Sequence, residues 1–113
     1  HYATNIIQTL YNTLMRTYDY ACHGRVAQAL RYYPSLCKTF EDWLIKHAHY
    51  MPVAYSRGAN GPSRIDRRKI LRYNTEKVFN IEDFNSFSKC VIEYISGMTD
   101  VYAIRVYEEI ISF

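Results

Sequence analysis

The chain has 113 residues, of which 49% are hydrophobic, and a net charge of +3. This apolar content predicts a packed core and excludes a disordered chain, and the length fits one domain that buries roughly two-thirds of its unfolded surface. No apolar run approaches the roughly 20 residues of a membrane-spanning helix and no secretory signal is visible, so we expect no membrane contact and a cytoplasmic protein.

The cysteines also limit which kinds of site the chain can contain. Cys22, Cys37 and Cys90 are odd in number and far apart, and no Cys-x-x-Cys pair occurs. This spacing disfavours a zinc site and a disulfide framework. We expect reduced thiols near the apolar faces of helices.

Apolar residues at helical intervals predict a first amphipathic helix from Thr4 to Cys22. Gly24 suits the end of this helix, and a short helical piece over Val26 to Arg31 follows. The predicted apolar stripe consists of Ile7, Leu10, Tyr11, Leu14, Tyr18 and Ala21.

Pro34 predicts the start of a second long helix, because proline favours the first helical turn. Pro52 marks the limit of this helix. Glu41 and Asp42 are expected to face solvent. The predicted apolar face consists of Leu36, Phe40, Trp43, Leu44 and Ala48.

Residues 57–77 form a basic segment with a net charge of +5, so the positive charge of the chain is concentrated here. Gly58, Gly61 and Pro62 exclude a continuous helix, and a small hairpin over about 70–79 and a helical turn are both compatible with the pattern. Four side chains of this loop are candidates for contact with a nucleotide phosphate or single-stranded nucleic acid: Arg64, Arg67, Arg68 and Lys69. The alternative is a solvated loop, or one paired with an acidic surface.

The C-terminal third predicts two helices separated by a tight joint at Gly97. Asn80 is a candidate cap for the first helix, which runs from about Phe84 to Ile95. Gly97 suits a left-handed conformation at the end of that helix. Thr99 can cap the second helix, and Asp100 in its first turn complements the helix dipole. With the two upstream helices, this gives an all-α fold of four longer helices in an irregular bundle with a long basic loop.

The joint carries a family resemblance. The run Tyr94-Ile95-Ser96-Gly97-Met98-Thr99-Asp100, followed by Val101-Tyr102-Ala103, resembles a signature near the C-terminus of bacterial deoxyguanosinetriphosphate triphosphohydrolases. Those enzymes belong to the HD superfamily of metal phosphohydrolases. A weaker likeness extends back through residues 34–36 and the helix that follows. The family usually has Arg or a similar polar residue where this chain has Val101.

This resemblance implies that residues 1–113 are a single helical domain at the C-terminus of a longer HD-type phosphohydrolase. The catalytic metal, Mg²⁺ or Mn²⁺, would lie in an N-terminal HD catalytic domain of the same chain, and the parent enzyme would be a homo-oligomer. Tyr94, Gly97, Met98, Thr99 and Asp100 are then the signature residues of this region. Tyr94 and Asp100 are the candidates for polar contacts beyond it, although fixing the turn is the competing role.

The chain itself shows no active site. An HD centre needs adjacent His and Asp, and no histidine here precedes an aspartate. His47 and His49 are two positions apart, so they point away from each other on a helix, whereas in an extended segment they could share an ion. A helix end with solvated imidazoles is the expected case, and we expect no metal, no cofactor and no catalytic residue in this chain. Ser96 lacks the strand and elbow of a serine nucleophile, and the Gly58–Pro62 stretch lacks the Lys-Ser/Thr ending of a phosphate loop. Glu108 and Glu109 are expected to be solvated.

Three functional hypotheses follow. The first is an accessory region of a dGTP triphosphohydrolase that is inactive alone and serves packing, pocket shaping or oligomerisation. The second is a stand-alone module that binds single-stranded nucleic acid through residues 57–77. The third is a helical protein-interaction domain without nucleotide contact.

Overall fold

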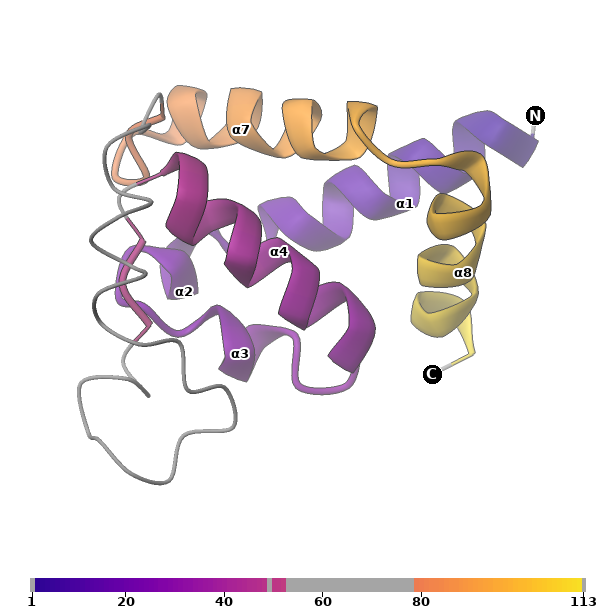
Figure 1. Cartoon of the computed structure of the whole chain (residues 1–113), viewed down its shortest axis with the longest axis horizontal. Helices are drawn as coiled ribbons and strands as arrows, with labels where there is room; N and C mark the ends of the chain where they lie inside the picture. The colour runs from indigo at the N-terminus through magenta and orange to yellow at the C-terminus, as the bar shows by residue number, and fades with distance from the viewer. Residues whose placement is uncertain (1, 49, 53–78, 113) are drawn as a thin grey trace.

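The computed structural model describes residues 2–48, 50–52 and 79–112. Within these ranges the chain forms six helices and no strand, which confirms the all-α fold (Figure 1). The four longer helices are α1 (Tyr2–Met15), α4 (Pro34–His47), α7 (Phe84–Ser96) and α8 (Asp100–Ile111). Two single-turn helices, α2 (Tyr18–Ala21) and α3 (Val26–Ala29), connect α1 to α4.

The helices pack around a core to which all six contribute. α1 packs against α7 and α8, and α4 packs against α3 and α7. α8 runs across the end of the bundle formed by the other long helices (Figure 1). The aromatic centre of the core is Phe40 of α4, whose ring lies 6.3 Å from that of Phe87 and 5.2 Å from that of Tyr94, both on α7.

The first predicted helix is broken in the structure. α1 ends at Met15 and α2 begins at Tyr18, whereas the pattern predicted one helix to Cys22. Thr17 is buried between them, and its hydroxyl donates a 2.6 Å hydrogen bond to the Leu14 carbonyl. A threonine hydroxyl that bonds a carbonyl of the preceding turn bends a helix, which accounts for the break. Gly24 lies three residues after the last residue of α2 and adopts φ 70° in the turn that follows this helix.

The buried stripe of α1 also differs from the predicted one at its first residue. Ile6 is 6% exposed and Ile7 is 56% exposed, so the first stripe residue is Ile6 and the prediction for Ile7 is wrong. Leu10 and Leu14 are fully buried as expected. One residue corresponds to about 100° around a helix, which suffices to move a side chain from the core to the surface.

The prediction for α4 is confirmed at its start and for most of its apolar face, but not at its end, because the helix stops five residues before Pro52 and Ala48, expected on the helical face, is extended. The helix begins at Pro34 and ends at His47, and Leu36, Phe40 and Leu44 are fully buried. Just beyond it, Ala48 forms an isolated parallel bridge with Phe79, whose N–H donates to the His47 carbonyl at 3.1 Å. The predicted hairpin at about 70–79 falls almost wholly on residues outside the described ranges.

The cap of α7 differs from the prediction. Asp83, and not Asn80, occupies the N-cap position, and its carboxylate accepts a hydrogen bond from the Asn85 N–H. Asn80 instead accepts from the Glu82 N–H at 3.0 Å, which forms an Asx turn before the helix. No helix in the described part of the chain has the length and apolar character needed to cross a membrane.

Candidate functional site

The joint between α7 and α8 is as tight as the sequence predicts, but its glycine behaves differently. Gly97 has φ −83° and ψ −4°, so it is right-handed and not left-handed as expected. A Cβ atom at this position would lie 3.7 Å from its nearest neighbours, the Glu93 and Tyr94 carbonyl oxygens. The joint therefore does not require glycine for backbone reasons.

The predicted cap of α8 is confirmed. The Thr99 hydroxyl accepts a 3.1 Å hydrogen bond from the Tyr102 N–H, and Asp100 is the first helical residue. The hydroxyl satisfies one of the free N–H groups at the helix start, and the Asp100 carboxylate lies near the positive end of the helix dipole. Local chemistry thus fixes where α8 begins.

Tyr94 uses its hydroxyl inside the fold. Its side chain is 8% exposed, and its hydroxyl lies 2.7 Å from the Thr39 hydroxyl of α4. The Tyr102 hydroxyl of α8 bonds the same Thr39 oxygen, so Thr39 ties α4 to both α7 and α8. Burial raises the pKa of Tyr94 above its ordinary value. Within the described part of the chain, Tyr94 therefore fixes the joint.

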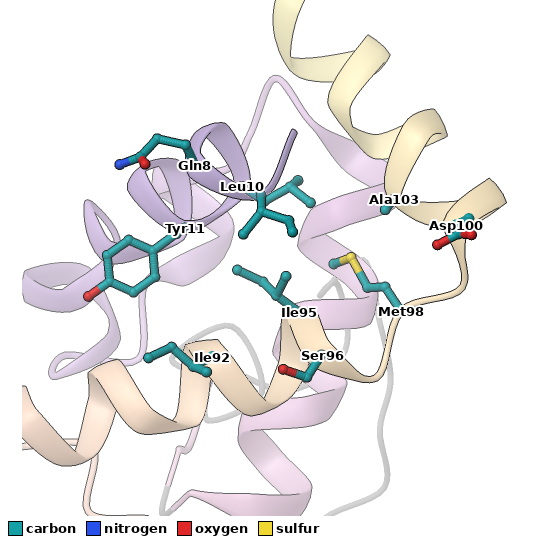
Figure 2. A pocket seen from close by; sticks show the side chains of 10 residues that line it. Gln8, Leu10, Tyr11, Ile92, Ile95, Ser96, Met98, Asp100 and Ala103 are labelled. Atoms are coloured by element: carbon teal, nitrogen blue, oxygen red, sulfur yellow. The ribbon is translucent and has the colours of Figure 1, made fainter. Parts of the chain in front are cut away.

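An apolar groove lies on the side of the joint that faces α1, between α1, α7 and α8 (Figure 2). It encloses about 560 Å³, and Leu10 of α1 and Ile95 of α7 face each other across it with Met98 beside them. Exposed Ile7 and Ile92 extend its apolar surface, and exposed Asp100 stands at one end. Its lining suits an apolar side chain or helix, so the groove offers a binding surface and not a catalytic site.

Glu109 of α8 has a role that the sequence reasoning missed. Its carboxylate accepts hydrogen bonds from the Ser35 N–H at 3.4 Å and the Leu36 N–H at 3.3 Å, in the first turn of α4. The α4 N-cap residue, Tyr33, makes no side-chain cap of its own. Glu109 therefore caps α4 from the far end of the chain, and the prediction that it is simply solvated is wrong. Glu108 is exposed as expected.

Glu41 is the second residue that the sequence reasoning misjudged. It is half-buried and not solvent-facing, and its carboxylate accepts a 2.7 Å hydrogen bond from the Tyr50 hydroxyl. The same hydroxyl accepts a 3.1 Å bond from the Val26 N–H at the start of α3. Burial raises the pKa of Glu41 above its ordinary value, and the bond from Tyr50 partly opposes this shift. A buried tyrosine 24 positions away thus caps α3.

The cysteines are free and at least half-buried, as the sequence predicts. Burial raises the pKa of Cys37 to about 12 and that of Cys90 to about 11. Both thiols therefore stay protonated at neutral pH, and neither is an activated nucleophile.

The remaining candidate residues are not placed. Arg64, Arg67, Arg68 and Lys69, together with the whole 57–77 segment, lie outside the described residues, as do His1 and His49. Among the residues that are described, no three His, Cys, Asp or Glu side chains gather in a way that could hold a metal ion.

The described chain is thus an all-α protein whose C-terminal helix pair packs on the first and fourth helices. Residues 65–109 match the family model of a phosphohydrolase-associated domain. The matched region includes all of α7, the joint and α8 as far as Glu109. This part of the chain is therefore similar to a region associated with HD phosphohydrolases. No curated protein and no solved structure matches the chain significantly.

Proposed function

We propose that this chain is the C-terminal helical accessory region of a deoxynucleoside triphosphate triphosphohydrolase, with dGTP as the reference substrate. The parent enzyme would convert a deoxynucleoside triphosphate and water into a deoxynucleoside and triphosphate. The observation that carries the proposal is the match of residues 65–109 to a phosphohydrolase-associated domain, a range that includes the Tyr94–Asp100 joint. In this proposal the Mg²⁺ or Mn²⁺ centre belongs to the HD catalytic domain.

The apolar groove is the surface that we assign to packing against that catalytic domain. Ile7 is 56% exposed and Ile92 is 50% exposed beside it, although both are aliphatic. Burying them removes apolar area from water, which is the main driving force of stable domain contacts. In addition to packing, the region would shape the nucleotide pocket and support oligomerisation.

The first experiment measures triphosphate release from dGTP with Mg²⁺ or Mn²⁺. The 113-residue chain alone is expected to give no turnover above the metal-only background. Robust turnover by this chain would contradict the proposal, because the catalytic centre would then lie within it.

The second experiment uses the longest protein that the gene encodes, including any residues before His1. Under the proposal those residues contain an HD centre, and the long protein hydrolyses dGTP. Ile92→Asp should lower that activity and the thermal stability, because it places a charge in the domain contact. Lys89→Asp on the same helix is the matched control, since Lys89 is exposed and does not line the groove. A gene without an upstream HD centre would end the proposal.

The basic segment supports a second candidate function, binding of single-stranded nucleic acid. The observation that supports this function is the net charge of +5 over residues 57–77. Binding of a fluorescent single-stranded oligonucleotide should then weaken steeply with salt and be lost on reversing the charge of Arg67 and Arg68. Absence of binding at low salt would exclude this function and leave the first proposal untouched.

A further inference from the structure

The outward face of α8 carries exposed apolar residues from its first turn to its last. Val101 is 71% exposed, Ile104 is 37% exposed and Ile111 is 58% exposed. Their spacing of three and seven residues places them on one stripe of the helix. Glu108 occupies the position of this stripe between Ile104 and Ile111. The inward face is already used, because Val106 is buried and Tyr102 and Glu109 bond α4.

Two charged residues interrupt or border this stripe. Glu108 lies within it and Arg105 lies beside it, and both are exposed. Neither side chain makes a hydrogen bond or an ion pair with another residue of the described part of the chain. Any partner that covers the stripe must therefore supply a cation near Glu108, because burying an unpaired carboxylate is costly.

A second copy of α8 in the opposite direction meets this requirement. In that arrangement Val101 of one copy lies opposite Ile111 of the other, and Ile104 lies opposite Glu108. Arg105 of each copy then lies within about one residue rise, 1.5 Å along the axis, of Glu108 of the other. A parallel pair would instead place the two Glu108 carboxylates against each other. The charge pattern thus distinguishes the two directions.

We propose that the outward face of α8 is a self-association surface that pairs antiparallel with a second copy of the chain about a two-fold axis. The face is self-complementary, as a two-fold interface requires: it is apolar at both ends, with one cation and one anion towards its middle. α8 has 12 residues, or about 18 Å of helix, so the contact is smaller than the roughly 800 Å² per partner of a standard interface. The dimer is therefore weak and reversible.

This inference deepens the oligomerisation role in the proposed function, but its test involves neither nucleotide nor metal. Failure of the pairing would leave the hydrolase assignment intact, and failure of that assignment would leave the pairing intact. The surface is also separate from the apolar groove, whose lining residues include neither Ile104 nor Glu108.

The experiment is sedimentation equilibrium of the 113-residue chain over a wide range of concentration, with circular dichroism to confirm that each variant stays helical. We expect a monomer–dimer equilibrium. Arg105→Glu and Glu108→Arg should each weaken it by about fivefold or more, because each places like charges together across the axis. The double variant Arg105→Glu/Glu108→Arg should recover the original dissociation constant to within about threefold, because it restores the pairs with their signs exchanged.

Two further variants keep the test decisive. Val101→Arg changes the most exposed apolar residue of the stripe and should abolish the dimer without unfolding the chain. Ile92→Asp in the groove should leave the dissociation constant unchanged. A chain that stays monomeric at millimolar concentration overturns the proposal. So does a dimer that is insensitive to both single reversals, or one that the double reversal fails to restore.

Discussion

The last two long helices carry their own N-terminal caps, whereas α3 and α4 take theirs from distant parts of the chain. Asp83 accepts from the Asn85 N–H, and Thr99 accepts from the Tyr102 N–H, each within three residues. By contrast, the Tyr50 hydroxyl caps α3 from 24 positions away, and Glu109 caps α4 from 73 and 74 positions away. The α7–α8 pair is thus fixed by local chemistry, while α3 and α4 depend on closure of the whole fold.

Tyr50→Phe should have the largest effect, because it removes the buried remote cap of α3. The Val26 N–H would lose its acceptor, and the Glu41 carboxylate would keep only its bond from the Cys37 thiol. A buried polar group left unsatisfied costs about 1–3 kcal/mol, so we expect the free energy of unfolding in urea to fall by about 2 kcal/mol. Tyr20→Phe is the control, since Tyr20 is 40% exposed and should change stability by less than about 0.5 kcal/mol. Equal effects would show that the Tyr50 hydroxyl does not serve as a cap.

Thr99→Ala tests a local cap. Loss of the hydroxyl leaves the Tyr102 N–H without its acceptor, and we expect a loss of about 1 kcal/mol in the free energy of unfolding. Thr99→Ser keeps the acceptor and should restore most of this loss. If both variants behave alike, the contribution of Thr99 is packing and the comparison between local and remote caps fails at this helix.

Glu109→Ala tests the second remote cap. Its two hydrogen bonds are long, at 3.3 and 3.4 Å, so we expect a loss of about 0.5 kcal/mol. Glu108→Ala provides a neighbour of the same type on the exposed side of α8. At concentrations where the chain is monomeric, Glu108→Ala should leave the free energy of unfolding unchanged. An equal loss of stability in Glu108→Ala and Glu109→Ala would argue against a specific cap of α4.

Glu41→Gln should change the pH dependence of stability more than stability itself, because the amide oxygen can still accept from Tyr50. Burial raises the pKa of Glu41 in the folded state, so the folded state binds its proton more tightly than the unfolded state does. The wild type should therefore lose stability relative to Glu41→Gln as the pH rises above the ordinary value of 4.5 and through the raised folded pKa. The raised pKa of Asp42 acts in the same direction in both proteins and cancels from the difference. Urea unfolding of both proteins between pH 4 and 8 measures this, and a difference independent of pH would contradict it.

Gly97→Ala should have the smallest effect, and its sign is informative. Gly97 is right-handed and the added Cβ makes only ordinary contacts at 3.7 Å, so alanine should be neutral or stabilising by about 0.5 kcal/mol. Thermal unfolding measures the change. A clear destabilisation would mean that the joint needs a conformation that only glycine adopts readily, as the sequence alone suggested.

The sequence predicts what depends on neighbours along the chain. The four long helices of the described ranges, the Pro34 start, the Thr99 cap and the Asp100 position follow from local pattern and helix-end chemistry, and the structure confirms them. The break at Thr17 and the cap at Asp83 are also local. They depend on which polar side chain bonds the nearby backbone groups, and the hydrophobic pattern does not decide this.

The remote contacts could not be predicted in the same way. Glu109 and Glu41 look like ordinary surface carboxylates in the sequence, since nothing near them shows which N–H or hydroxyl they meet. Their partners become neighbours only when α8 crosses α4 and when the segment after α4 returns to α3. The one available signal was that Tyr33 and Arg25 are poor N-cap residues, which leaves two helix starts in need of an outside acceptor.

Trp43 gives the fold a built-in optical reporter. It is the single tryptophan of the chain, and its indole N–H donates to the Cys90 sulfur at 3.2 Å across the contact between α4 and α7. Its ring also lies 4.0 Å from that of His47 and 5.7 Å from that of Tyr94. Separation of α4 from α7 would remove both the thiol and the phenol from the indole. Intrinsic fluorescence of the unlabelled protein will therefore follow this one contact, independently of the helix content that circular dichroism reports.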